Sequence, residues 1–101
     1  MNEELDKQLC NPGVINMNRH EEILTILQEE CAEVIQAVSK IKRFGTPENY
    51  TNLAKEMGDL QCMLNLMYEY EVVSCTLEDR LNNISAKRQK LKIYSGIFNG
   101  Q

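Results

Sequence analysis

The chain has 101 residues, of which 11 are Lys or Arg and 15 are Asp or Glu, so its formal net charge at pH 7 is −4. This length allows one domain, and a lone domain of this size buries only a modest share of its surface. The acidic balance argues against nucleic-acid binding, because the neutralisation of phosphates needs a cationic surface. No apolar run approaches the ~18 residues of a membrane span, and the acidic N-terminus does not resemble a signal peptide. We therefore expect a cytoplasmic protein with no membrane partner.

The cysteines do not indicate a disulfide framework or a zinc site. The four of them are far apart and form no C-x-x-C pair, whereas both kinds of site rely on characteristic spacings or an oxidising compartment. They are Cys10, Cys31, Cys62 and Cys75.

Residues 1–17 combine polar side chains with the turn signal Asn11-Pro12-Gly13, which predicts a loosely structured N-terminal arm. A helical domain is expected over residues 18–95, and residues 96–101 then form a C-terminal tail. Asn18 is a good helix N-cap, and Glu21 three residues later completes a capping-box pattern.

Apolar residues at alternating spacings of three and four predict a first helix from Asn18 to Phe44. Gly45, Thr46 and Pro47 suit the end of this helix, the N-cap of the next and its first turn. The predicted seam of the first helix comprises Leu24, Leu27, Cys31, Val34, Val38 and Ile41, and that of the second comprises Leu53, Met57, Leu60, Leu64 and Met67.

The second helix is expected to end near Tyr70, before a β-branched break at 72–75, and the region from Glu69 to Cys75 could be locally extended. Thr76 and Asp79 form another capping-box pattern, which starts a third helix that ends near Gly96. Its apolar residues are Leu77, Leu81, Ile84 and Leu91. The short joints predict an all-α fold in which three main helices form an antiparallel bundle.

Two acidic motifs lie within these helices: Glu29-Glu30-Cys31-Ala32-Glu33 in the first and Glu56-Met57-Gly58-Asp59 in the second. At 100° per residue Glu30 lies at the edge of the apolar arc, and Glu56 lies inside it. Residues at i and i+3 share a helix face, so each helix offers two acids on one side.

Such placement is unfavourable, because burying a carboxylate costs several kcal/mol of folding free energy unless the carboxylate is paired or binds a cation. Oxygen ligands without His or Cys favour Mg²⁺ or Mn²⁺ over zinc. A simpler alternative is that these acids form a solvated helix face with no metal. For Glu29 this alternative and a role at the metal site have about equal weight. The alternative has much less weight for Glu30 and Glu56, whose helix neighbours are Leu and Val.

E-E-x-x-E on one helix followed by E-x-x-D on the next resembles the all-α nucleoside triphosphate pyrophosphohydrolases of the MazG-like family, which includes dimeric dUTPases and dCTP pyrophosphatases. The resemblance covers residues from about 18 to 94. It implies hydrolysis of a nucleoside or deoxynucleoside triphosphate to the monophosphate and pyrophosphate, for nucleotide-pool control or sanitation. It also implies that Mg²⁺ is held by Glu30, Glu33, Glu56 and Asp59, with Glu29 as an outer group or as the base that orients water.

The last predicted helix is basic, since no acid follows Asp79. The family resemblance implies that a basic stretch here contacts phosphate, and Asn83, Lys87 and Lys90 are the candidates. Solvated lysines near a helix C-terminus, favoured by the macrodipole, are an alternative of nearly equal weight.

Some functions are less well supported by the sequence. No glycine-rich P-loop is present, and a di-iron bundle needs E-x-x-H pairs, whereas His20 lies in neither acidic motif. His20 itself is expected to be structural. A non-enzymatic helical adaptor is the main alternative, although an adaptor has no reason to place Glu30 and Glu56 among Leu and Val.

Apolar residues outside the main seams predict self-association. Ile23, Ile26, Ile35 and Met63 lie beside the seams, so a monomer would expose an apolar patch of the kind that marks an interface. We expect a homotetramer formed as a dimer of dimers, or a homodimer, with a four-helix core.

Overall fold

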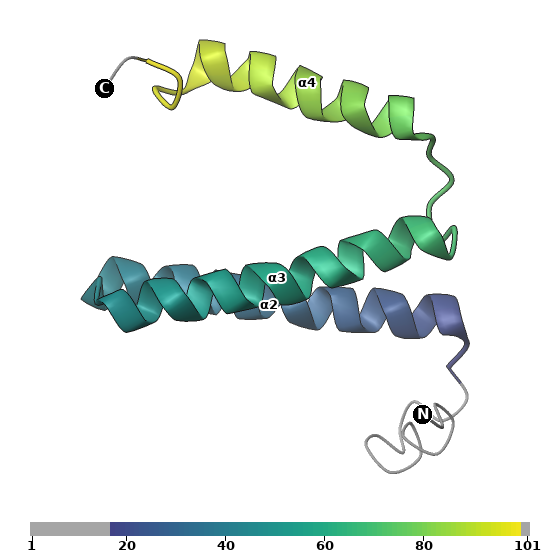
Figure 1. Ribbon diagram of the computed structural model, residues 1–101, viewed down its shortest axis with the longest axis horizontal. Coiled ribbons are helices and arrows are strands. Elements are labelled where there is room, and N and C mark those ends of the chain that lie inside the picture. Colours follow the sequence, from purple (N-terminus) through teal and green to yellow (C-terminus); the bar gives the residue numbers. More distant parts are fainter. Residues whose placement is uncertain (1–16, 100–101) are drawn as a thin grey trace.

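The computed structural model describes residues 17–99, which form three α-helices joined by short connections (Figure 1). They are α2 (Arg19–Phe44), α3 (Pro47–Glu69) and α4 (Leu77–Tyr94). No strand occurs within residues 17–99, so the all-α prediction is confirmed. The predicted arm, except for Met17, and the last two residues of the predicted tail lie outside the described residues, as do Cys10 and the Asn-Pro-Gly turn signal.

The helix starts follow the predicted caps. The Asn18 side chain accepts a hydrogen bond from the Glu21 backbone N–H at 2.8 Å, and its amide donates to the Glu21 carboxylate at 3.1 Å. At α4, both bonds of a capping box join Thr76 and Asp79. These side chains satisfy backbone N–H groups that have no partner inside a helix.

The joint between α2 and α3 is tight because Gly45 has a left-handed backbone, with φ at 61°. Glycine adopts this conformation without the steric penalty that a side chain brings. Pro47 then occupies the first turn of α3, where its missing N–H costs nothing. Thr46 is at the N-cap position, but its hydroxyl accepts from the Asn49 side chain instead of capping a backbone N–H.

The hairpin of α2 and α3 packs along its length (Figure 1), on faces that only partly overlap those that the sequence predicted. Its buried apolar residues are Ile23, Ala37 and Met63. Some seam residues are half-buried beside them, namely Leu27, Val34, Ile41, Leu53, Leu60 and Met67. The others are exposed, among them Leu24 at 46% and Met57 at 55%. The prediction was wrong in part, because the centre of the apolar stripe was assumed to face the neighbouring helix, whereas the contact is centred on an arc that overlaps one side of the stripe.

Helix α4 runs antiparallel to α3, as expected, but it does not pack along the hairpin (Figure 1). None of its residues is buried, and Leu77, Leu81 and Ile84 are between 52% and 60% exposed. The connection at 70–76 includes Glu71 at a φ of 53° and turns the chain away from α3. Only the first turn of α4 stays close, where the Arg80 guanidinium lies 4.1 Å from the centre of the Tyr68 ring.

Side chains at the start of α2 bind the end of α3. The His20 Nε2 donates to the Tyr70 carbonyl at 2.9 Å, and the Arg19 guanidinium lies 4.6 Å from the centre of the Tyr70 ring. His20 therefore has a structural role in the hairpin, as expected. Cys31, Cys62 and Cys75 are free thiols, and within the described part of the chain no helix has the length and apolar character that crossing a membrane requires.

Candidate metal centre

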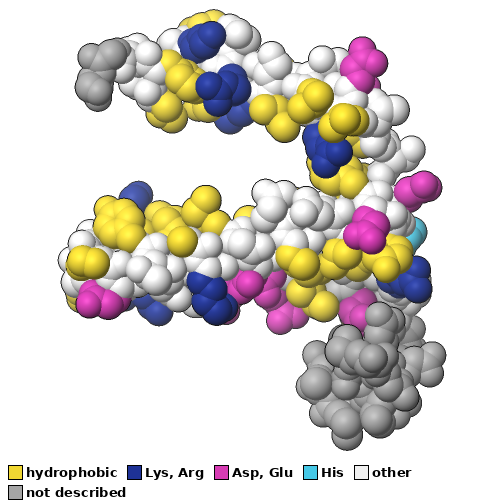
Figure 2. Space-filling model, in the orientation of Figure 1, with side chains coloured by type: hydrophobic (Ala, Val, Ile, Leu, Met, Phe, Trp, Pro, Cys, Tyr) yellow, Lys and Arg dark blue, Asp and Glu magenta, His cyan; other side chains and the backbone are white. Residues whose placement is uncertain are grey.

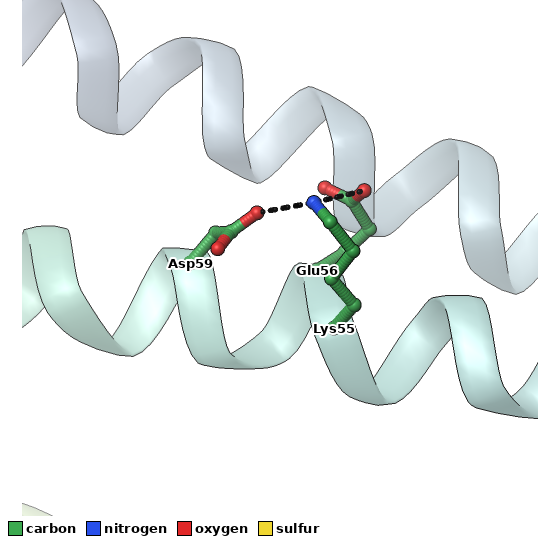
Figure 3. Close-up of polar contacts among 3 residues, drawn as sticks. All are labelled: Lys55, Glu56 and Asp59. Atoms are coloured by element: carbon green, nitrogen blue, oxygen red, sulfur yellow. Dashed lines mark hydrogen bonds and ion pairs between the residues drawn. The ribbon is translucent and has the colours of Figure 1, made fainter.

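Carboxylates from α2 and α3 meet halfway along the hairpin. One oxygen from each of Glu30, Glu56 and Asp59 lies within 4.8 Å of the other two. Figure 3 shows Glu56 and Asp59 on the same side of α3, close to the ribbon of α2. The i, i+3 spacing on α3 and the tight joint at Gly45 together account for this arrangement.

Burial differs across this acidic cluster, by which we mean Glu30, Glu56 and Asp59. The Glu56 side chain is only 12% exposed and that of Asp59 is 44% exposed, while Glu30 is half-buried. Glu33, the fourth predicted ligand, is exposed and lies outside the group of converging oxygens. Glu29 is also exposed on α2.

Electrostatics at Glu30 reflect this crowding. Its pKa is raised above the ordinary value, first by burial and then by repulsion from Asp59, Glu56 and Glu33, while Lys55 acts in the opposite direction. Both causes disfavour the ionised form. A cation placed among these oxygens would relieve the repulsion.

This raised pKa predicts that ionised Glu30 destabilises the metal-free fold. A carboxyl whose pKa is higher in the folded state binds protons more tightly there, so its stabilising contribution is lost as the pH rises through that folded pKa. With chelator present at neutral pH, E30Q should therefore melt at a higher temperature than wild type. The difference should vanish as the pH falls below 4.5, where Glu30 is protonated in both states. A pH-independent difference in thermal melts between the two proteins would contradict the assignment.

Lys55 is part of the same environment, and the sequence reasoning missed it. Its Nζ donates to Asp59 Oδ2 at 3.0 Å and lies 3.7 Å from Glu56 Oε1 (Figure 3). The pKa of Lys55 is raised, first by the hydrogen bond to Asp59 and then by the charges of Asp59 and Glu56. The signal was present in the sequence, because Lys and Asp at i and i+4 on a helix are neighbours.

The acidic cluster suits a hard divalent cation. All its donors are carboxylate oxygens, which Mg²⁺ and Mn²⁺ prefer. Opposite ligands of an octahedral Mg²⁺ are about 4.2 Å apart, twice its ligand distance of about 2.1 Å. The three oxygens lie within 4.8 Å of one another, so one pair of them is close to that separation and the group would need to contract to share one cation.

The predicted phosphate-binding residues are not brought to this cluster within one chain. Asn83, Lys87 and Lys90 are exposed on α4, and within residues 17–99 no hydrogen bond or ion pair joins them to the acidic cluster. In Figure 2, acidic side chains halfway along the hairpin lie at its edge away from α4, which carries several Lys and Arg side chains. The acidic and basic groups are therefore separate in the single chain.

Comparison with protein families gives one clear result. A model of the MazG nucleotide pyrophosphohydrolase domain matches residues 18–92, a stretch that contains α2, α3 and nearly all of α4. Separate comparisons with curated proteins and with solved structures found no match.

Proposed function

Since the chain belongs to the MazG nucleotide pyrophosphohydrolase family, we propose that it cleaves a nucleoside or deoxynucleoside triphosphate to the monophosphate and pyrophosphate, with Mg²⁺ or alternatively Mn²⁺. The observation that carries the proposal is the convergence of three carboxylates from α2 and α3 within 4.8 Å. Its biological role would be nucleotide-pool control or sanitation.

Each acidic residue has a distinct part in this proposal. Glu30, Glu56 and Asp59 would hold the metal, with Glu33 as a fourth ligand that would have to turn toward them, and the metal when bound would neutralise charge on the triphosphate. Glu29 orients the attacking water and accepts its proton. The water oxygen bonds to the α-phosphorus, the bond from this phosphorus to the bridging oxygen breaks, and pyrophosphate leaves.

Asn83, Lys87 and Lys90 are proposed to bind the phosphates. Because they are separate from the acidic cluster within one chain, the proposal places the α4 of a second copy near the cluster. Lysine ammonium groups bind phosphate as point charges, so their role is substrate affinity and not metal binding.

Self-association is the arrangement that best accounts for the exposed apolar surface. Among the described residues only three hydrophobic side chains are buried, whereas Ile35, Leu64 and Ile84 are among the many that remain exposed. Helices depend mainly on the packing of an apolar face for their stability. A second copy offers the same unpaired faces, and two hairpins together make the proposed four-helix core of a homodimer or a dimer of dimers.

Metal binding should stabilise the fold. At a concentration one hundred times its Kd, a ligand specific for the native state contributes about 2.7 kcal/mol, which corresponds to a rise in Tm on the order of 10 °C for a small domain. Thermal melts with millimolar Mg²⁺ and with chelator measure this rise. K87M and K90M serve as controls, since they should keep the metal-induced rise while binding substrate more weakly. Identical melts with and without Mg²⁺ would argue against the site.

The activity itself is tested with a panel of common ribo- and deoxyribonucleoside triphosphates, Mg²⁺ or Mn²⁺, and detection of pyrophosphate. Release of pyrophosphate with the matching monophosphate supports the proposal. If no triphosphate is cleaved, the catalytic proposal fails and the helical adaptor takes its place.

A further inference from the structure

Lys55 is the only Lys or Arg on α3, and it lies at the level of the acidic cluster. The cations on α2 are Arg19, Lys40, Lys42 and Arg43. Each is ten or more residues from Glu30, which is about 15 Å or more along the helix axis. Halfway along the hairpin, Lys55 is therefore the one basic side chain beside three converging carboxylates.

The contacts of Lys55 are those of a counterion. Its ammonium lies 3.0 Å from Asp59 and 3.7 Å from Glu56, two of the residues proposed to hold the metal. A cation bound between these carboxylates would compete with the ammonium for the negative charge of Asp59, whose Oδ2 the ammonium contacts. A divalent ion and a nearby ammonium also repel each other, so full occupancy of both positions is unfavourable.

The Lys55 side chain is exposed, so its ammonium has room to move away from Asp59. Its side chain is 69% exposed, whereas that of Glu56 is 12% exposed. The long flexible stem therefore reaches the acidic cluster from its solvent side, which is the side from which a triphosphate would approach. An ammonium held there can leave Asp59 without unpacking the hairpin.

We propose that Lys55 is an internal counterion of the acidic cluster, which a divalent metal displaces from Asp59 and which then binds the phosphates of the incoming nucleotide. The phosphate-binding role in this inference rests on the proposed function. It assigns Lys55 two opposite effects, a lower affinity for the free metal ion and a higher affinity for the nucleotide.

The experiment compares wild type, K55M, K55R and K40M. K55M keeps most of the aliphatic stem and removes the charge, while K55R keeps the charge. K40M is the matched control, because it makes the same change in net charge at an exposed residue of α2 remote from the cluster. Circular dichroism checks that all four proteins remain helical.

Titration calorimetry with MgCl₂ alone, at low ionic strength, tests the counterion. An exposed ion pair contributes 0.2–1 kcal/mol, so K55M should bind Mg²⁺ about 1.4- to 5-fold more tightly than K40M, and K55R should resemble wild type. Metal-free K55M should also melt below metal-free wild type, because the repulsion among the carboxylates is no longer offset. Equal or weaker Mg²⁺ binding by K55M relative to K40M would overturn the inference.

Steady-state hydrolysis tests whether Lys55 binds the phosphates of the nucleotide. With saturating Mg²⁺, K55M should raise KM for the triphosphate by about tenfold, the usual effect of losing a hydrogen bond between charged groups, while kcat changes little. An unchanged KM would overturn the assignment of Lys55 to phosphate binding.

These measurements separate this inference from the proposed function. If wild type cleaves no triphosphate but K55M binds Mg²⁺ more tightly, the counterion role stands and the proposed function fails. If wild type is active and K55M matches K40M in Mg²⁺ affinity, the proposed function stands and the counterion role fails. Absence of Mg²⁺ binding by wild type would overturn both.

Discussion

Replacing any of Glu30, Glu33, Glu56 and Asp59 with its amide should lower kcat/KM for the triphosphate by about a thousandfold or more. The amides keep the volume of the side chain but remove the charge that holds the cation. Electrostatic stabilisation of the transition state contributes several kcal/mol in reactions of this kind, and each 1.36 kcal/mol is a factor of ten in rate. Pyrophosphate release under substrate-limiting conditions measures the loss.

E69Q provides the matched control for these variants. Glu69 is an exposed carboxylate at the end of α3, away from the acidic cluster, so the same chemical change there should leave activity within about twofold of wild type, as surface substitutions usually do. Far-ultraviolet circular dichroism should show unchanged helicity in all five variants. Full activity in E56Q or D59N would show that the catalytic metal is held elsewhere.

I84D should convert the assembled protein to monomers. Leu77, Leu81 and Ile84 recur at i, i+4 and i+7 on α4 and are all exposed in the single chain. Burial of one such side chain contributes about 2 kcal/mol, and a symmetric dimer loses two of them, which raises the dimer Kd by about a thousandfold. Sedimentation at micromolar concentration should give the monomer mass. The loss of partner contacts should also reduce the helix content of α4.

N82D is the control for I84D. It introduces the same charge on the same helix at an exposed residue whose azimuth is away from the stripe of Leu77, Leu81 and Ile84. It should sediment like wild type. A monomeric wild type, or an I84D variant that sediments like wild type, would refute the role of α4 in assembly.

Local signals in the sequence predicted the helices well. Asn18, Thr76 and Gly45 act within a few residues of their own positions, so the helix boundaries they indicate do not depend on tertiary packing.

The spacing of the acidic residues also predicted part of the candidate site. Glu30 and Glu56 were expected near the helix contact because of their apolar neighbours, and the structure places both of them there, partly buried.

Packing between elements could be predicted only in part from the same patterns. Ala37 is the most deeply buried of the three core residues, yet a small side chain adds little to an apolar stripe, and periodicity therefore favoured Leu24 and Val38. A stripe indicates that a face will be covered but not which helix covers it. For α4 the short connection suggested α3, whereas the apolar stripe of α4 stays unpaired in the single chain.

Lys55 was missed for a different reason. Its i, i+4 relation to Asp59 is visible in the sequence, but an isolated ion pair of this type is common on exposed helices and carries little energy. The ion pair matters for the candidate site because the folded hairpin brings Glu30 of α2 near Lys55 and the acids of α3. The sequence pattern of α3 alone does not show this.

The joint at residues 44–47 fixes the register of the two acidic helices. Glu30 precedes Gly45, and Glu56 and Asp59 follow it, all within rigid helices. One residue inserted or deleted inside α2 after Glu30, or inside α3 before Glu56, would rotate the carboxylate by about 100° and shift it by about 1.5 Å relative to the joint. The helical stretches between the acids and the joint are therefore compatible with the metal centre only where their lengths are kept, whereas the connection at 70–76 is free of that constraint because α4 carries none of the converging acids.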